Sequence, residues 1–141
     1  MSKEQKYWDE RSKKWLEDSY GKNAKGNFVR FKIVDDFLKN IKGKKVLDAG
    51  CGAGYLLKHL LDNKYNARGI DFSKGMVKTT KNLLIENNYD PKRASLGSVK
   101  NLSQFKNAEF DVVILTGVLQ YIKNHKKVYD ECHRILKKNG V

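Results

Sequence analysis

The chain has 141 residues, a formal net charge of +13 from 29 Lys and Arg against 16 Asp and Glu, and a hydrophobic fraction of 40%. This length suits one domain and excludes a two-domain enzyme, while the apolar content excludes an intrinsically disordered chain. No run of about 18 apolar residues occurs and the first twenty residues are charged throughout, so neither a membrane span nor a secretory signal is predicted. We therefore expect a cytoplasmic protein with reduced thiols at Cys51 and Cys132.

The positive charge is concentrated at the two ends of the sequence. The net charge is +6 over residues 1–45, +1 over residues 46–90 and +6 over residues 91–141, and Lys supplies 24 of the 29 basic residues. Specific recognition of phosphates or bases favours Arg, whose planar guanidinium donates two parallel hydrogen bonds, and the chain has only five Arg. A solvated Lys-rich surface is therefore favoured over a nucleic-acid-binding surface.

Two helices are predicted ahead of the first strand. Residues 3–18 carry a narrow apolar stripe on a charged background, with Trp8 and Trp15 seven positions apart. Gly and Asn residues then mark a loop, and from Phe28 onward apolar residues recur at helical spacing. Gly43 is expected to end this second helix.

Beyond residue 44 the chain alternates between strands and helices. Strands are expected at 45–48, 66–71, 93–97 and 110–116, with helices after the turn at 50–54, after the N-cap Ser73, and from His125 to a stop at Asn139-Gly140. This alternation predicts an α/β fold whose parallel sheet is covered by helices on both faces. In such sheets ligands bind beyond the carboxyl ends of the strands, so a site is expected after Leu47, Ile70 and Leu115.

Three glycines follow the first strand in the string Asp48-Ala-Gly50-Cys-Gly52-Ala-Gly54. Closely spaced glycines permit positive φ and allow the backbone to approach a bulky ligand. A dinucleotide fold would need its third glycine at Tyr55, and a carboxylate just before the loop repels a pyrophosphate. The string instead suits a ligand with a positively charged amino group, and Asp71 at the end of the next strand supports a ligand site over a bare turn.

Four segments in order resemble motifs of the class I S-adenosylmethionine-dependent methyltransferases, in particular the ubiquinone and menaquinone biosynthesis type. They are Val46–Gly54, Gly69–Ser73, Phe110–Ile122 and His133–Gly140. The resemblance implies a Rossmann-like doubly wound parallel sheet with strands 1 to 4 in the order 3-2-1-4 and helices on both faces. It also implies S-adenosyl-L-methionine as the cofactor and methyl transfer as the activity.

The resemblance assigns roles to particular residues. Asp48, Gly50 and Gly52, with the small Cys51 between the glycines, would line the methionine end of the cofactor. Asp71 would accept hydrogen bonds from the ribose hydroxyls, and Phe72 would lie against the adenine. Ser98 departs from the Asp common in the family, so its hydroxyl or the Val99 backbone would serve the adenine amino group. Thr116 would lie near the transferred methyl, and the residues expected to face the substrate are Gln120, Tyr121 and Tyr20.

The expected reaction needs few catalytic groups from the protein. Methyl transfer from a sulfonium needs alignment, and a general base only if the acceptor must lose a proton. No base is assigned, His125 being the one His worth testing, and no metal site is predicted. Thr116-Gly-Val-Leu lacks the prolines typical of base methyltransferases, which favours a small-molecule O, N or C acceptor. The alternatives are a non-catalytic cofactor- or partner-binding module, and an RNA methyltransferase or RNA-binding protein.

The whole chain, residues 1–141, is interpreted as one S-adenosylmethionine-binding domain. Residues 1–27 would form a helix that either covers the site as a lid or simply packs on the core, and residues 28–141 would form an incomplete core. Strands 5 to 7 of the family fold have no residues to form them, which would leave Val112 to Leu115 as an exposed edge. We therefore expect a truncated product, an engineered fragment or half of a complex, with a protein partner or a missing C-terminal segment covering that edge.

Overall fold

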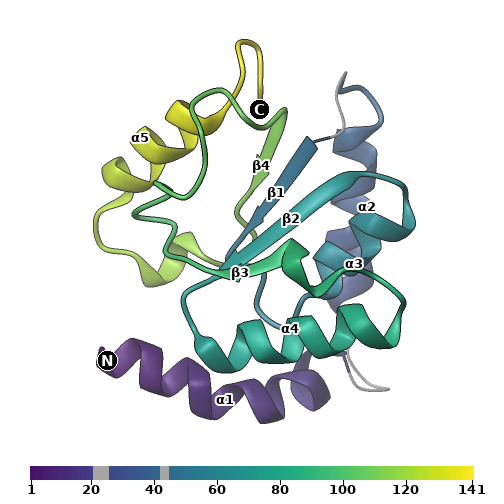
Figure 1. The fold of residues 1–141 in the computed structure, drawn as a ribbon, viewed down its shortest axis with the longest axis vertical. Helices are drawn as coiled ribbons and strands as arrows, with labels where there is room; N and C mark the ends of the chain where they lie inside the picture. Colours follow the sequence, from purple (N-terminus) through teal and green to yellow (C-terminus); the bar gives the residue numbers. More distant parts are fainter. Residues whose placement is uncertain (21–25, 42–44) are drawn as a thin grey trace.

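The structure is a computed structural model that describes residues 1–20, 26–41 and 45–141, with the side chains of 13, 16–20 and 26–28 left out of the description. One parallel sheet with the order β3-β2-β1-β4 lies at its centre (Figure 1). The strands are β1 (Lys45–Ala49), β2 (Asn66–Asp71), β3 (Ala94–Leu96) and β4 (Val112–Ile114). Val46 lies opposite Ala67 on one side and Val112 on the other. The predicted strand order is confirmed.

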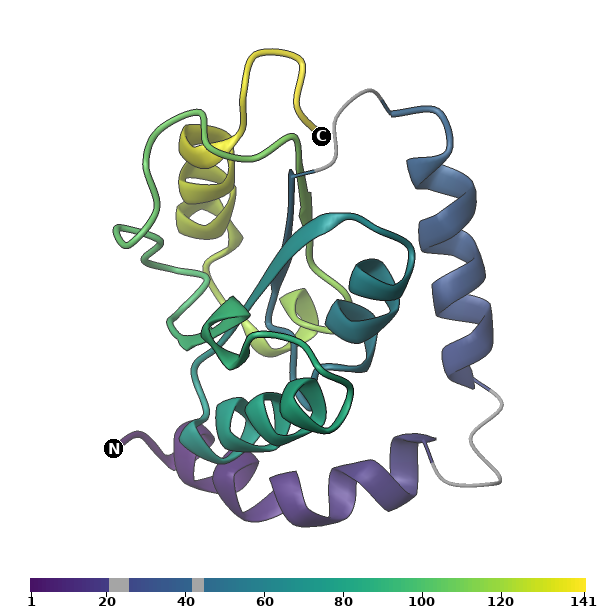
Figure 2. The same cartoon turned by 45° about the vertical axis from the view of Figure 1, so that its right-hand side comes forward.

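Helices cover both faces of the sheet, as predicted. They are α1 (Lys3–Tyr20), α2 (Gly26–Leu38), α3 (Tyr55–Asp62), α4 (Lys74–Glu86) and α5 (His125–Ile135), with short 3-10 turns η1 (Pro91–Arg93) and η2 (Leu119–Tyr121). Figure 2 shows α2 and α3 on one side of the sheet and α5 on the other. The first helix, α1, runs beside α4 across the end of the sheet where the strands finish.

The core consists of two apolar clusters, one on each face of the sheet. Neighbouring residues of a strand point to opposite faces, so Val46 belongs to the cluster beneath α2, α3 and α4 while Leu47 belongs to the cluster beneath α5. Both side chains are fully buried. A strand that is apolar on both faces is what a parallel sheet between two helical layers requires, and the sequence predicted such strands on this ground.

Two boundaries near the C-terminus differ from the sequence prediction. The strand expected at 110–116 is paired as a strand only over Val112–Ile114. The last helix ends at Ile135, before the expected stop at Asn139-Gly140. The cause is a backbone contact, since the Lys137 amide donates to the Phe110 carbonyl at 2.9 Å and draws the chain out of the helix. The predicted stop of the second helix at Gly43 lies outside the described residues.

The β4 strand forms an edge of the sheet whose outer side is already used by the end of the chain. The Val113 amide donates to the Val141 carbonyl at 2.8 Å, and the Val141 amide donates to the Asp111 carbonyl at 3.0 Å. This alternation is the hydrogen-bond pattern of a parallel ladder. Val112 is buried, whereas the next residues of β4 are half-buried.

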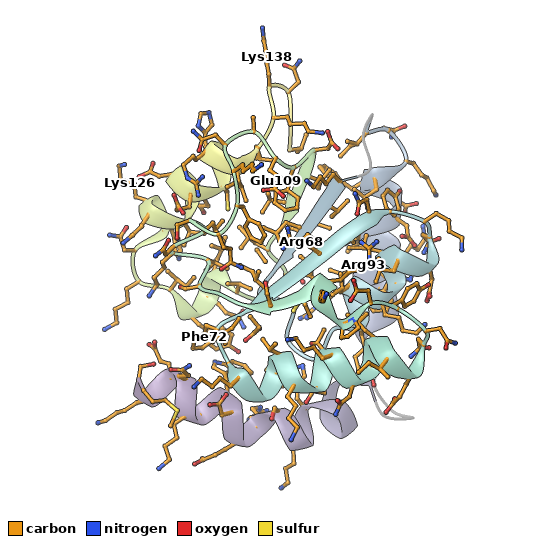
Figure 3. The ribbon with its side chains drawn as sticks, in the orientation of Figure 1. Arg68, Phe72, Arg93, Glu109, Lys126 and Lys138 are labelled. Atoms are coloured by element: carbon orange, nitrogen blue, oxygen red, sulfur yellow. The ribbon has the colours of Figure 1, made fainter. Side chains whose placement is uncertain are left out.

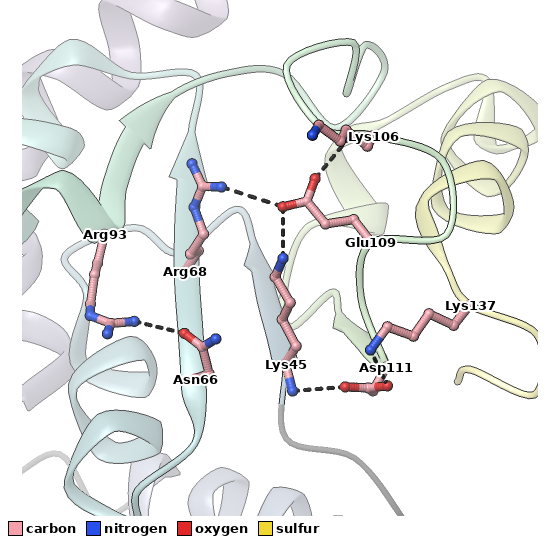
Figure 4. Close-up of polar contacts among 8 residues, drawn as sticks. All are labelled: Lys45, Asn66, Arg68, Arg93, Lys106, Glu109, Asp111 and Lys137. Atoms are coloured by element: carbon pink, nitrogen blue, oxygen red, sulfur yellow. Dashed lines mark hydrogen bonds and ion pairs between the residues drawn. The ribbon is translucent and has the colours of Figure 1, made fainter.

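A group of charged side chains ties together the amino-terminal ends of the strands (Figure 4). The Glu109 carboxylate accepts from Lys45 Nζ at 3.0 Å and lies 3.5 Å from the Arg68 guanidinium, so it links β1 to β2. Burial raises the pKa of Glu109, but the Lys106 amide and the Lys45 ammonium outweigh burial and hold the pKa below its usual value. Glu109 is therefore ionised and paired at neutral pH.

Replacing Glu109 by Gln is expected to lower the free energy of unfolding at pH 7 by about 1–2 kcal/mol, because Lys45 and Arg68 lose a partly buried counter-ion. A lowered native pKa contributes stability above the unfolded pKa and loses it as pH falls, so the difference between the variants shrinks toward pH 3. Urea unfolding at pH 7 and pH 3.5 measures both effects. Asp130→Asn, which removes an exposed pair with Lys126, serves as the control and should change stability by less than about 0.5 kcal/mol. Equal losses in the two variants would contradict this account.

Candidate functional site

A cavity of about 480 Å³ lies at the carboxyl ends of the strands, beneath α1. Its volume is within the range of roughly 300–1,000 Å³ typical of small-molecule sites. The expected cofactor residues that line it are Asp48, Gly50, Cys51, Gly52, Asp71, Phe72, Ser98, Val99 and Thr116, and the expected substrate residues that line it are Gln120 and Tyr121. The side chain of Tyr20, the remaining substrate candidate, lies outside the described part. The structure thus gathers residues from four separate segments into one cavity.

The glycine turn between β1 and α3 adopts a backbone that requires glycine. Gly50, Gly52 and Gly54 have φ values of +88°, +53° and +86°. A Cβ on Gly54 would lie 2.5 Å from the Thr80 methyl group, and a Cβ on Gly50 would collide with Val118. The amide groups of Gly50 and Cys51 both donate to the Ile70 carbonyl at 2.8 Å, which fixes the turn against the end of β2. The turn therefore presents bare backbone to the cavity, as the sequence predicted.

Asp48 places a buried carboxylate against the cavity. Its side chain is 1% exposed, it lines the cavity, and its Oδ2 atom has no hydrogen-bond partner among the described residues. Burial, reinforced by the nearby charge of Asp71, raises the pKa of Asp48 to about 7. A buried carboxylate oxygen without a donor lowers the stability of the free protein. Such a group is typical of a binding site, where a ligand supplies the missing donor. The arrangement suits a ligand with a cationic amino group.

Asp71 ends β2 and joins the two loops that flank the cavity. One carboxylate oxygen accepts from the Gly52 amide and the other accepts from the Ser73 amide, both at 2.9 Å. Burial raises the pKa of Asp71, whereas these backbone hydrogen bonds lower it, and the net shift is upward. Each carboxylate oxygen keeps a further lone pair, so Asp71 can also accept from a ligand diol.

The other end of the cavity lies between β2, β3 and the loop that follows β3. Phe72 and Val99 provide apolar walls there, and Met76 of α4 adds a flexible thioether. Figure 3 shows Phe72 at the end of β2, above α1. The Ser98 hydroxyl already accepts from the Lys100 amide at 3.2 Å, but it can still donate to a ligand. These surfaces fit a flat heteroaromatic ring with polar edges.

The first helix forms the roof of the cavity with its aromatic side chains. The Trp8 ring meets Trp15 at 5.3 Å and Tyr121 at 5.2 Å between ring centroids, both edge to face. Since Tyr121 belongs to η2, these contacts connect α1 with the segment that follows β4. Tyr121 is 52% exposed, so it forms the rim of the cavity and not a part of the core. The sequence left a lid and a packing helix as alternatives, and α1 both contributes to the cavity lining and packs against α4.

The cavity lining also includes polar groups to which the sequence assigned no role, among them Lys3, Glu4, Lys100, the Arg30 guanidinium and the Trp15 indole nitrogen. Arg30 of α2 lines the cavity with one guanidinium nitrogen 3.7 Å from the position that a Cβ on Gly117 would occupy. The Trp15 indole nitrogen lies 3.9 Å from the corresponding position on Gly52. Neither the guanidinium nor the indole nitrogen has a hydrogen-bond partner or an ion-pair partner among the residues that the structure describes. Only tertiary contact between α1, α2 and the sheet brings them here, so no local sequence pattern marks them.

Candidates for acid–base or metal chemistry are few. His125 does not line the cavity, and its Nε2 lies 2.9 Å from the Leu119 carbonyl. In the described parts of the chain no three His, Cys, Asp or Glu side chains cluster as metal ligands would. Burial raises the pKa of Cys51 well above its usual value, and both cysteines are free. No helix among the described residues is long and apolar enough to cross a membrane.

Comparisons with known proteins identify the family and the fold. A family model described as "Methyltransferase domain" matches residues 47–141. The ubiquinone biosynthesis O-methyltransferase of Dechloromonas aromatica (strain RCB) is 31% identical over 114 residues, which are 81% of this chain and 48% of that protein. The YcgJ protein from Bacillus subtilis has a TM-score of 0.72 at 23% identity, over 80% of this chain and 48% of that chain. A putative S-adenosyl-L-methionine-dependent methyltransferase from Methanococcus maripaludis has a TM-score of 0.69 at 23% identity, over 96% of this chain and 59% of that chain.

A 3-2-1-4 parallel sheet, a glycine turn after its first strand and an acidic residue ending its second are the features of the class I S-adenosylmethionine-dependent methyltransferases, whose cofactor is S-adenosyl-L-methionine. The family model covers about two thirds of the sequence, and the chain belongs to the methyltransferase domain family. The chain spans about half the length of the curated relatives it matches.

Proposed function

We propose that this chain binds S-adenosyl-L-methionine in the cavity beneath α1 and that the protein transfers the methyl group to a small-molecule acceptor. The single observation that carries the proposal is the buried carboxylate of Asp48, which lines the cavity and whose Oδ2 atom has no hydrogen-bond partner among the residues that the structure describes. The ionised carboxylate favours a cationic partner, and the methionine end of this cofactor carries an ammonium group.

The charges around the cavity match a ligand with charges of both signs at one end. Asp48 would bind the ammonium group, and the unpaired donors of Arg30 and Trp15 would bind the neighbouring carboxylate. Asp71 would hold the ribose hydroxyls, and Phe72, Ser98 and Val99 would hold the adenine. The bare glycine turn, from Gly50 to Gly54, would let the ligand lie directly on the backbone.

When bound, the cofactor supplies an electrophilic methyl group on a sulfonium. The protein then has to position the acceptor and exclude water, because alignment of the reacting atoms provides most of the acceleration. Thr116, Gln120 and Tyr121 follow β4 and line the same cavity, so they are proposed to face the acceptor. Oxygen is the favoured acceptor atom, since the curated relatives are named as O-methyltransferases.

The outer side of β4 is proposed to be covered by further polypeptide. Val141 already pairs with β4 in a parallel ladder, and the curated relatives are about twice as long as this chain. A strand that continues the pairing of Val141 would satisfy the remaining backbone groups of the edge. A related structure, at 23% identity, is a complex of a Haloferax volcanii putative methyltransferase with the Trm112 activator, so a separate protein is the alternative cover.

The test is calorimetric titration with S-adenosylhomocysteine, the product form of the cofactor. We expect one site per chain, and we expect Asp71→Ala to weaken binding by about 100-fold or more, because the ligand diol and two backbone amides all lose their acceptor. Asp62→Ala, which removes a half-exposed carboxylate on α3 that does not line the cavity, is the control and should bind normally. No binding by the unmodified chain, or equal binding by Asp71→Ala, would overturn the proposal.

A further inference from the structure

Asp9 of α1 joins the roof of the cavity to the loop that carries Asp71. Its Oδ1 atom accepts from the Ser73 hydroxyl at 2.6 Å and from the Gly75 amide at 2.9 Å. The Ser73 hydroxyl in turn accepts from the Met76 amide at 3.1 Å, as the N-cap of α4. A carboxylate from one helix thus extends the cap of another, where it also faces the positive end of the helix dipole.

The backbones of α1 and α4 approach each other closely at this point. A Cβ on Gly75 would lie 2.6 Å from the Ser12 hydroxyl and 3.0 Å from the Asp9 carbonyl. The Ser12 side chain is buried, and its hydroxyl donates to the Asp9 carbonyl at 2.7 Å. Gly75 is not needed for its φ, since it lies in the first turn of a regular helix. Its lack of a side chain is needed so that α1 can pack closely against α4.

The same loop is held at its other side by Gln5, one turn earlier in α1. The side-chain Nε2 of Gln5 donates to the Phe72 carbonyl at 3.0 Å. Residues 71–75 are therefore fixed by α1 on both sides of Ser73, while Asp71 and Phe72 within that segment line the cavity. Through Trp8, α1 also reaches Tyr121 on the opposite rim. One helix spans the cavity and is bound to the loop beneath it.

We propose that Asp9 is a positioning residue for the cofactor. By binding Ser73 and Gly75, Asp9 holds the 71–75 loop in the conformation that binds the ligand. The same contacts link that conformation to the packing of α1 against α4. This inference rests on the proposed function. Asp9 itself does not line the cavity, so it acts through the loop. Because coupling between two sites is reciprocal, a ligand that orders the loop must also tighten the seating of α1.

The test combines amide hydrogen exchange with calorimetric titration of S-adenosylhomocysteine. In the unmodified chain the ligand should slow exchange across α1 as well as in the 71–75 loop. In Asp9→Ala, exchange at Ser73, Gly75 and α1 should rise without ligand, and the Kd should increase about tenfold. Glu10→Ala is the matched control, because Glu10 is the next residue of α1 and its side chain is exposed. Its Kd and its amide exchange should equal those of the unmodified chain.

A second variant reaches the same junction without touching Asp9. Gly75→Ala adds a methyl group where α1 must pass, although Ala would otherwise favour the helix. It should also release α1 and raise the Kd several-fold. Tight binding with a protected α1 in both variants would overturn the proposal. If the unmodified chain and Glu10→Ala both fail to bind, the proposed function fails, while unchanged exchange at Ser73 and Gly75 in Asp9→Ala would separately refute the role of Asp9.

Discussion

Asp48→Asn is expected to give a more stable protein that no longer binds S-adenosylhomocysteine well. The substitution removes a buried negative charge that the free protein leaves uncompensated, so the free energy of unfolding should rise by roughly 2–4 kcal/mol at pH 8. The same change removes the charge that faces the ligand ammonium, so the Kd should rise about 100-fold. Thermal unfolding and calorimetric titration measure the two effects.

The pH dependence of this variant follows from the pKa of Asp48. Burial raises the native pKa to about 7 from 3.8. Between these values the native state binds more protons than the unfolded state, so the contribution of Asp48 to stability falls as pH rises through this window and is lowest above pH 7. The stability gain in Asp48→Asn should therefore be larger at pH 8 than at pH 5. Since a ligand cation favours the ionised carboxylate, affinity in the unmodified chain should increase over the same range.

Asp111→Asn provides a control at a carboxylate that is paired with Lys137 on the far side of the molecule. It should leave the Kd unchanged and should not stabilise the fold. Unchanged affinity in Asp48→Asn at pH 8, or a loss of stability equal to that of Asp111→Asn, would contradict the role assigned to Asp48.

Gly54→Ala is expected to have the largest effect on stability, a loss of about 3 kcal/mol or more. A side chain at φ +86° costs roughly 1–2 kcal/mol, and the added Cβ would lie 2.5 Å from the methyl group of a fully buried Thr80. Thr80 has no freedom to move, because its hydroxyl donates to the Gly52 carbonyl at 2.7 Å. Urea unfolding measures the loss.

Gly52→Ala is the matched comparison within the same turn. Its φ is also positive, but among the described residues the added Cβ would approach just the Trp15 indole nitrogen, at 3.9 Å. We expect a loss of only about 1 kcal/mol in stability from the backbone conformation, together with weaker ligand binding, because the methyl group enters the cavity. Similar stability losses in Gly52→Ala and Gly54→Ala would show that the contact with Thr80 does not matter.

The sequence predicted the fold well where a local rule determined it. Ser73 was identified as an N-cap because its hydroxyl accepts from the amide three residues later, and the structure has this contact. The strand 66–71 was predicted with the bounds that the structure shows. The end of α5 was predicted too late, at Asn139-Gly140 and not at Ile135, because the competing contact, from Lys137 to Phe110, joins segments 27 residues apart.

The candidate site likewise contains residues that a local sequence pattern predicts and residues that only tertiary contacts bring together. The glycine turn and Asp71 belong to contiguous motifs, and the sequence predicted that they would meet at the carboxyl edge of the sheet. Arg30 and the contacts of Asp9 with Ser73 and Gly75 were not predicted, because they depend on where α1 and α2 lie relative to the sheet.

The most direct test of the central claim is a crystal structure of this chain with S-adenosylhomocysteine. We predict one ligand in the cavity beneath α1, with its ammonium group within hydrogen-bond distance of Asp48 and its ribose hydroxyls on Asp71. The carboxylate is predicted to lie against Arg30 and Trp15. An empty cavity at saturating ligand, or a ligand whose ammonium group lies away from Asp48, would contradict the account.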